Sequence, residues 1–234
     1  MNNNNYKSGC CVCGKDLIYK NESENMSCFY CGKQSYANVT CLDGHYVCDN
    51  CHASSANDLI ENFCINTLLE NPLDLAESIM NHPNIKMHGP EHHFLVPAVL
   101  LASYYNKTKQ YQKKESKIKE ARKRAEMILG GFCGSHGNCG AAVGTGIFAS
   151  LIKDNNPLAS KKWKDSNMMT AKSLTTIAEH GGPRCCKRNS FLAIEAAIEC
   201  FSDVLHKDKN IVCHFNKYNK ECKRNKCPYF KNNA

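Results

Sequence analysis

The chain has 234 residues, 17 of them cysteine, and a formal net charge of +8. This length suits one hydrophobic core and a small extra module. Its longest apolar runs, 94–105 and 141–152, are too short to span a bilayer, and its polar start shows no signal peptide. We therefore expect a soluble, cytoplasmic protein with no membrane partner, in which clustered cysteines indicate metal binding rather than disulfides.

The positive charge is weak support for a nucleic-acid partner. Metal-bound cysteines are thiolates, so a four-thiolate zinc site carries about −2 and a 4Fe–4S cluster on three thiolates about −1. Two such zinc sites and one cluster would lower the net charge from +8 to roughly +3.

The N-terminal part predicts a zinc-ribbon module over residues 10–54, after a disordered polar segment, residues 1–9. The module contains two Cys-x2-Cys-Gly turns, formed by Cys10 with Cys13 and by Cys28 with Cys31. In such zinc knuckles backbone N–H groups face the sulfurs, and glycine supplies a positive φ. Fourteen residues separate the two knuckles, which predicts that they form a zinc ribbon. Cys11 is a spare thiol that competes for ligation.

A second zinc site is predicted just after the knuckles. Its ligands would be three cysteines and one of two histidines: Cys41, Cys48, Cys51 and His45 or His52. In the alternative interpretation Cys41 is a core thiol, and a single zinc ion takes four of the module's cysteines. In both cases the module is too small to bury its own core, so metal stabilises it and its role is structural.

The body, residues 55–206, is expected to be a helical metal-cluster domain, which makes the fold mainly α. Apolar residues recur at helical spacing in five regions: 55–81 (two short helices), 107–129, 141–152, 166–179 and 188–206. The helix 107–129 carries nine Lys or Arg residues up to position 124. The one aromatic residue of this segment, Tyr111, is assigned to its apolar inner stripe. The basic face therefore has no aromatic side chains for base stacking, and a solvated face is favoured over a nucleic-acid surface.

Three chemically active segments precede helices of the body. The first holds His88, Glu91, His92 and His93 beside a Gly-Pro turn, a cluster typical of ligands or proton-transfer groups. The other two are glycine-rich loops, one with Cys133, His136 and Cys139, the other with Cys185 and Cys186. A helix start favours thiolate and so lowers a thiol's pKa. We expect the two loops to meet and share a metal centre.

The tail, residues 207–234, adds three cysteines on a polar, lysine-rich segment: Cys213, Cys222 and Cys227. Such thiols are poor candidates for a core. They predict another metal site, or a strap that closes over one.

Three segments of the body resemble the iron–sulfur L-serine dehydratase α chain and the L-cysteine desulfidases, over roughly residues 85–205. The run from Gly89-Pro90 to Val96-Pro97-Ala98-Val99-Leu100 is similar to that family's "APTNGA" loop and following "IPAVL". The loop from Cys133 to Cys139-Gly-Ala-Ala-Val-Gly resembles "GCQGEVGVAC". The segment Cys185-Cys186-Lys187-Arg188-Asn189 resembles "CIERN". The whole chain also resembles a cysteine-rich family of anaerobes with an N-terminal zinc ribbon.

The resemblance implies a 4Fe–4S cluster with one iron open to a small hydroxy or thiol substrate, hence a lyase or sulfur-transfer reaction. The pool of cluster ligands would be Cys133, Cys139, Cys185 and Cys186. His92, His93 and His136 would be candidate bases, Glu91 could orient one of them, and Lys187 or Arg188 could hold a carboxylate. In the alternative interpretation Arg188, at a helix start, only packs and caps its loop. The family's middle cluster cysteine has no counterpart in 167–183. The third ligand must therefore be the second member of a cysteine pair or come from the tail.

Other functions remain open. The knuckles alone fit a non-enzymatic zinc-binding adaptor or regulatory module. Thiol redox chemistry between Cys185 and Cys186 is disfavoured because vicinal cysteines close a strained ring. Nucleic-acid binding ranks last. The sequence leaves the oligomeric state open, and thiolate softness suits both zinc and iron.

Overall fold

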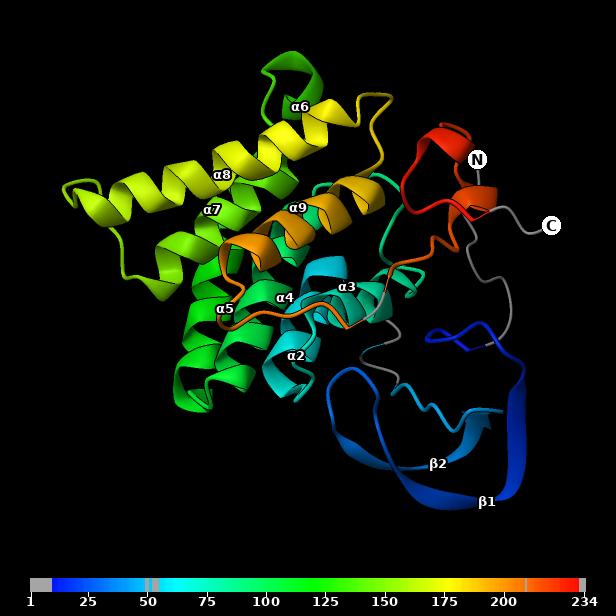
Figure 1. The fold of residues 1–234 in the computed structure, drawn as a ribbon. Helices are drawn as coiled ribbons and strands as arrows, with labels where there is room; N and C mark the ends of the chain where they lie inside the picture. Colours follow the sequence, from blue (N-terminus) through cyan, green and yellow to red (C-terminus); the bar gives the residue numbers. More distant parts are fainter. Residues whose placement is uncertain (1–9, 49–50, 52–54, 209, 232–234) are drawn as a thin grey trace.

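The computed structural model describes residues 10–48, 51, 55–208 and 210–231. As predicted, the fold is mainly helical, with a two-stranded N-terminal sheet and a cysteine-containing tail (Figure 1). The disorder expected for residues 1–9 lies outside the described residues. The elements, in chain order, are β1 (Leu17–Ser27), β2 (Gln34–Cys41), α2 (Ala56–Asn66), α3 (Pro72–Met80), α4 (Glu91–Lys107), α5 (Tyr111–Glu126), α6 (Phe132–Ser135), α7 (Gly140–Ile152), α8 (Lys161–Glu179), α9 (Cys186–Cys200) and the 3-10 turns η1 (Asn216–Tyr218) and η2 (Arg224–Lys226).

Helix α4 lies at the centre of the body, with α2, α3, α5, α7 and α9 packed around it (Figure 1). It is buried along almost its whole length, as expected of a helix that is apolar on all sides. Pro97 lies inside this helix. A Cβ on Gly144 of α7 would lie only 2.8 Å from Cδ of Pro97. Glycine at this position therefore lets α7 approach α4 closely, near the start of both helices.

Helix boundaries differ from the predicted ones where local backbone geometry intervenes. The helix predicted over 107–129 begins only at Tyr111, because Lys109 adopts a left-handed conformation (φ 56°) that interrupts the helical path. Helix α8 begins at Lys161, ahead of the predicted 166, and α9 covers 186–200 rather than 188–206. The early start of α9 makes Cys185 its N-cap residue.

The N-terminal module docks on the body through the second knuckle. Between its cysteines lie Phe29 and Tyr30, and both rings pack against Phe63 of α2, with centroids 5.5 and 5.7 Å away. Tyr30 is fully buried and also contacts His82 edge-on at 4.9 Å. The strands β1 and β2 pair antiparallel, from Leu17 opposite Cys41 to Ser27 opposite Gln34. The rings of Phe29 and Tyr30 thus anchor the module on α2.

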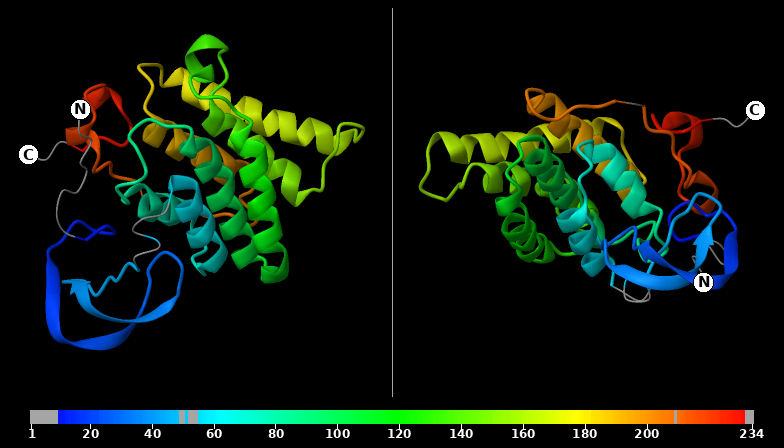
Figure 2. Two further views of the ribbon diagram at one scale, coloured as in Figure 1. Left: turned by 180° about the vertical axis from the view of Figure 1, so that it is seen from behind. Right: turned by 90° about the horizontal axis from the view of Figure 1, so that it is seen from below.

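The tail folds back along α9, at the same end of the body as the module (Figure 2). The Cys213 N–H donates to the Tyr229 carbonyl at 2.7 Å, which closes the tail into a loop. Tyr229 packs on Phe191 of α9 with ring centroids 5.4 Å apart, and its hydroxyl donates to Glu195 at 2.5 Å. In the described part of the chain no helix has the length and apolar character needed to cross a membrane.

Candidate metal centres

Two groups of four ligands in the N-terminal module could each hold a metal ion such as zinc. The first group is Cys10, Cys13, Cys41 and His45; the second is Cys28, Cys31, Cys48 and Cys51. In each group the ligand atoms lie within 4.8 Å of one another. Both knuckles have the expected turn, with a positive φ at Gly14 (75°) and Gly32 (70°). Backbone N–H groups face the sulfurs, since Val12 donates to Cys10 Sγ at 3.3 Å.

The two groups interleave along the chain, which differs from the expected ribbon. The first knuckle shares its group with Cys41, at the end of β2, and with His45. The second knuckle shares its group with Cys48 and Cys51, which come later in the chain. The sulfurs of Cys13 and Cys41 lie 3.7 Å apart, as do those of Cys31 and Cys48. Four thiolates at about 2.3 Å around one zinc ion lie about 3.8 Å from one another. The module therefore has the ligand spacing of two mononuclear sites. His52, the other candidate ligand, lies outside the described residues.

A cavity of about 380 Å³ opens where α4, α7 and α9 begin. We call it the histidine cavity; the residues that matter for its chemistry are His88, His93, Cys133, Cys139, Arg184 and Cys186. None of the three helices has a side-chain N-cap hydrogen bond. Their first N–H groups and dipoles thus favour negative charge in this region. The predicted meeting of the two glycine-rich loops is present here as Cys139 and Cys186.

The two histidines at the start of α4 differ in their environment. His92 is buried, and both its ring nitrogens are engaged, with the Lys86 carbonyl at 3.0 Å and with Ser190 at 3.3 Å. Burial lowers the pKa of His92 to about 3, so it stays neutral and has no free nitrogen. His93 donates from Nδ1 to the Ile128 carbonyl at 3.1 Å. Burial also lowers the pKa of His93, so Nε2 is the unprotonated nitrogen at neutral pH.

The thiols at the start of α9 do not have the lowered pKa that the sequence predicted. Burial raises the pKa of Cys185, and it raises the pKa of Cys186 to about 11. The Gly89 N–H and the Arg184 charge act in the opposite direction on Cys186 but are the smaller effects. Desolvation therefore outweighs the helix start, and ligation of a metal at these thiols requires release of their protons.

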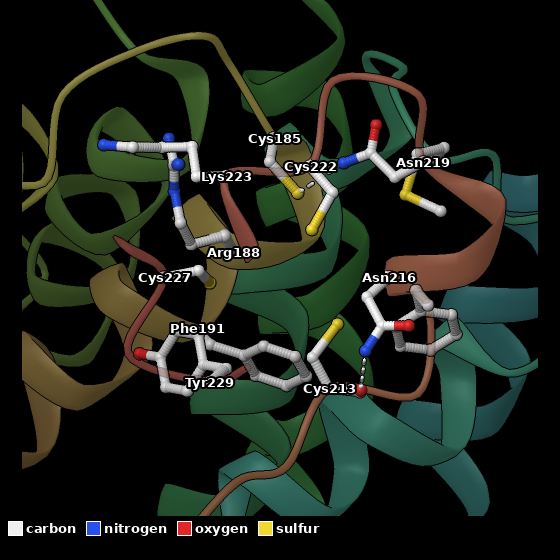
Figure 3. A pocket seen from close by; sticks show the side chains of 12 residues that line it. Cys185, Arg188, Phe191, Cys213, Asn216, Asn219, Cys222, Lys223, Cys227 and Tyr229 are labelled. Atoms are coloured by element: carbon white, nitrogen blue, oxygen red, sulfur yellow. Dashed lines mark hydrogen bonds between the residues drawn. The ribbon is translucent and has the colours of Figure 1, made fainter. Parts of the chain in front are cut away.

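Adjacent cysteines at this helix start face different sites. Cys186 lines the histidine cavity, whereas Cys185 lines a smaller pocket closed by the tail. Figure 3 shows that pocket, with the thiols of Cys185, Cys213, Cys222 and Cys227 around it. We call it the four-cysteine pocket. Of the four predicted cluster ligands, Cys133, Cys139 and Cys186 thus line the histidine cavity. Cys185 instead lies with the three tail cysteines in the four-cysteine pocket.

The model of DUF5714, a family of unknown function, matches residues 60–230, well over half of the chain. The chain belongs to the DUF5714 family. No curated protein and no solved structure matches it. The DUF5714 region contains the histidine cavity and the four-cysteine pocket, whereas the two interleaved groups of the N-terminal module lie before it.

Within the DUF5714 region the remaining candidates lie away from the histidine cavity or are otherwise engaged. His136 is exposed, stacked on Phe132 with ring centroids 4.3 Å apart. Glu91 is buried and accepts the Lys86 N–H at 2.9 Å, which holds the loop before α4. Arg188 donates to the Gly181 and Pro183 carbonyls at 2.8 and 3.1 Å. It therefore caps the glycine loop and is not available to a substrate.

Lys187 is also unavailable to a substrate, because its side chain is buried and already bonded. It is 1% exposed, donates to the Met80 carbonyl at 2.8 Å and lies 4.1 Å from the centre of the Phe215 ring. The cation that does line the histidine cavity is the exposed Arg184, which the sequence did not single out. Asn219, also missed, donates to Cys185 Sγ at 3.6 Å. Asn219 lies in a polar tail, where no sequence pattern distinguishes it as a partner of a cysteine.

Proposed function

We propose that the chain is an iron–sulfur lyase whose reaction takes place in the histidine cavity. Cys133, Cys139 and Cys186 would hold a 4Fe–4S cluster there. The observation that carries the proposal is that thiols from the starts of α7 and α9 line one cavity together with His93. The resemblance to the iron–sulfur dehydratases points to the same chemistry.

The donor set suits such a cluster. Three thiolates ligate three of the four irons and leave the fourth without a protein ligand. Asn189 supports the set, because its amide donates to Cys139 Sγ at 3.7 Å. A cavity of about 380 Å³ also has room for a small substrate. When bound, the cluster would supply a Lewis-acidic iron that polarises a hydroxyl or thiol leaving group.

The side chains of the cavity supply the other roles. Neutral His93, with Nδ1 fixed on the Ile128 carbonyl, presents Nε2 as the base that takes the proton α to a carboxylate. The electron pair of that C–H bond forms the double bond as the β-hydroxyl or β-thiol departs. Arg184 and the three helix starts favour binding of the substrate carboxylate. Small hydroxy or thiol amino acids are therefore the proposed substrates.

The test begins with anaerobic purification and measurement of iron, acid-labile sulfide and zinc. We expect iron and sulfide in equal amounts, at about four of each per cluster, and loss of one cluster's content in Cys186→Ala. Cys200→Ala is the matched control, because Cys200 lies on the same helix but is exposed. Zinc without iron, even after anaerobic reconstitution with iron and sulfide, would refute the proposal.

Turnover is then assayed as release of ammonia or sulfide from serine, cysteine and related amino acids. His93→Gln should keep its iron and lose at least about 100-fold in rate, the usual contribution of a general base. His136→Gln should behave as wild type, because that ring lies outside the cavity. A His93→Gln protein that turns over normally would exclude His93 as the base.

Glycine 140 offers a finer test of the base. A Cβ there would lie 2.2 Å from the His93 ring, so Gly140→Ala must displace the imidazole. We expect lower turnover with unchanged iron. Gly134→Ala is the control, since a Cβ at Gly134 meets nothing within 4 Å. Equal rates for both variants would contradict the assigned role of His93.

A non-enzymatic role as a zinc-binding adaptor is the second candidate. It is favoured by the two interleaved ligand groups of the N-terminal module, which lie outside the family region. An adaptor requires the module and its zinc alone, so it predicts no iron and no turnover in the body.

A further inference from the structure

The four-cysteine pocket brings together thiols from two distant parts of the chain. Cys185 is the N-cap residue of α9, and the other three thiols come from the tail. In Figure 3 the four cysteines stand around one space, and the tail passes it on two sides, beside Cys227 and beside Cys213. Four thiolates around a shared space are a complete ligand set for one metal centre.

The spacing of these sulfurs differs from that in the N-terminal module. Both module groups draw their ligand atoms within 4.8 Å of one another, and among the described residues no such compact group includes a cysteine of the four-cysteine pocket. Around one zinc ion the sulfurs would lie about 3.8 Å apart. In a 4Fe–4S cluster each thiolate binds a different iron at a different corner, so the sulfurs stand farther apart. The wider set therefore suits a cluster better than a single ion.

The walls of the pocket also suit a cluster. Four side chains make them mainly apolar: Met87, Phe191, Phe215 and Tyr229. Two donors point at the sulfurs, the Asn219 amide to Cys185 Sγ at 3.6 Å and the Arg224 N–H to Cys222 Sγ at 3.4 Å. The buried Arg188 lines the same space and offsets the net charge of about −2 that four thiolates give such a cluster. Apolar walls, N–H donors and a buried cation are the features that stabilise clusters and set their potential.

The Asn219 donor is itself held in place. Its side-chain oxygen accepts a hydrogen bond from His88 Nε2 at 3.3 Å. Because an amide oxygen only accepts, this contact turns the amide nitrogen toward Cys185. Asn219 thus has a fixed orientation that a merely solvent-exposed tail residue does not need.

We propose that Cys185, Cys213, Cys222 and Cys227 bind a second 4Fe–4S cluster, ligated entirely by cysteine, which fastens the tail to α9. This site is separate from the cluster proposed for the histidine cavity. It would stand if the lyase proposal failed.

The test uses the full-length chain, reconstituted anaerobically with iron and sulfide. Cys222→Ser combined with Cys227→Ser should lose about four irons and four sulfides relative to wild type, with zinc unchanged. Cys200→Ser, on the exposed end of α9, should lose none. Cys139→Ala with Cys186→Ala should retain the cluster of the four-cysteine pocket and lose the other. The two proposals therefore fail separately.

Two outcomes would overturn the inference. One is full iron and sulfide in the Cys222/Cys227 variant. The other is a wild-type chain that takes up one zinc at these cysteines and no cluster, seen as a fall of one zinc equivalent in the variant. Circular dichroism would show that the helices of each variant have folded.

A further test leaves all four cysteine ligands in place. Asn219→Leu deletes the hydrogen bond to Cys185 Sγ while keeping four thiolates. Because N–H donors stabilise the reduced, more negative cluster, we expect a lower midpoint potential with full iron content. Asn216→Leu is the control: Asn216 lies in the same part of the tail, but its amide donates to the Cys213 carbonyl, at 3.4 Å, rather than to a sulfur. Equal potentials in the two variants would contradict a cluster ligated by Cys185.

Discussion

The N-terminal module and the helical body are stabilised by different forces. Most residues of β1 are exposed, and the buried residues near the strands are chiefly cysteines. The body instead buries apolar side chains on every helix around α4. A module with so little apolar burial would depend on metal ions at its two ligand groups, whereas the body depends on the hydrophobic effect.

The module and the body also differ in the spacing of their cysteine sulfurs. In the module, each knuckle has one sulfur 3.7 Å from that of a later cysteine, Cys13 from Cys41 and Cys31 from Cys48, which suits one ion. In the body, cysteines from separate loops, helix starts and the tail line two pockets, and among the described residues none of them belongs to a group as compact as those of the module. The backbone that carries the cysteines therefore sets how far apart their sulfurs lie.

Metal removal should have the largest effect, and it should affect the module and the body differently. A zinc chelator should unfold residues 10–48 while the helices of the body persist, because only the module lacks an apolar core. Trypsin would then cleave at Lys15, Lys20 and Lys33, and mass spectrometry should recover a resistant fragment that spans α2 to α9. Simultaneous loss of helical circular dichroism and of the module would show that the body also depends on zinc.

The interleaved ligand groups make a prediction about pairs of cysteines. Cys10→Ser with Cys41→Ser should remove one of two zinc ions, because both residues belong to one group. Cys10→Ser with Cys28→Ser should remove both, because it damages each group once. In a ribbon formed by the two knuckles, the second pair would instead cost a single ion. Zinc content by mass spectrometry of the purified proteins decides between the two arrangements.

The body should respond to loss of apolar contacts rather than to loss of zinc. Leu100 of α4 is fully buried, whereas Leu158 is 97% exposed. Leu100→Ala should lower the free energy of unfolding by about 2–5 kcal/mol, from lost transfer energy and the remaining cavity. Leu158→Ala should change it by less than about 0.5 kcal/mol. Urea unfolding followed by helical circular dichroism measures both, and equal costs would contradict the assigned core.

The sequence predicted the elements better than it predicted which ligands combine. Helical periodicity gave the mainly α body, because apolar spacing records which face is buried. Knuckle turns were recognisable because Cys-x2-Cys-Gly fixes a local backbone shape. The pairing of Cys10 with Cys41, and of Cys185 with the tail, joins residues 28 or more positions apart in the sequence. Only tertiary packing brings them together, so no local pattern contains them.

The burial of individual side chains also could not be predicted from the sequence. The helix start at Cys186 is visible in the sequence, but the desolvation that raises its pKa depends on the loops that cover it. Similarly, Lys187 or Arg188 was a candidate to hold a substrate carboxylate, yet packing directs both side chains to backbone carbonyls, and Arg188 takes the alternative role of capping its loop. Arg184, two residues before Cys186, lines the cavity instead.

The smallest effect is expected for the ion pairs between α2 and α5 at the surface. Arg122 contacts Asp58 at 2.8 Å, Glu61 at 3.2 Å and Glu126 at 2.9 Å. Since these groups are partly exposed, Arg122→Gln should cost only up to about 1 kcal/mol at neutral pH. Lys119→Gln, which removes one exposed pair with Glu115, is the control and should cost less.

The cost of Arg122→Gln should also depend on pH with a definite sign. The Ser55 hydroxyl, and then Arg122, lower the pKa of Asp58 in the folded chain, and Arg122 lowers the pKa of Glu126. A depressed carboxyl pKa stabilises the fold above the unfolded pKa, near about 4, and that contribution is lost as the pH falls through the folded pKa. The stability difference between wild type and Arg122→Gln should therefore shrink between about pH 6 and pH 3.5. A difference that stays constant or grows on acidification would mean that Arg122 acts through packing of its stem on α2 rather than through these carboxylates.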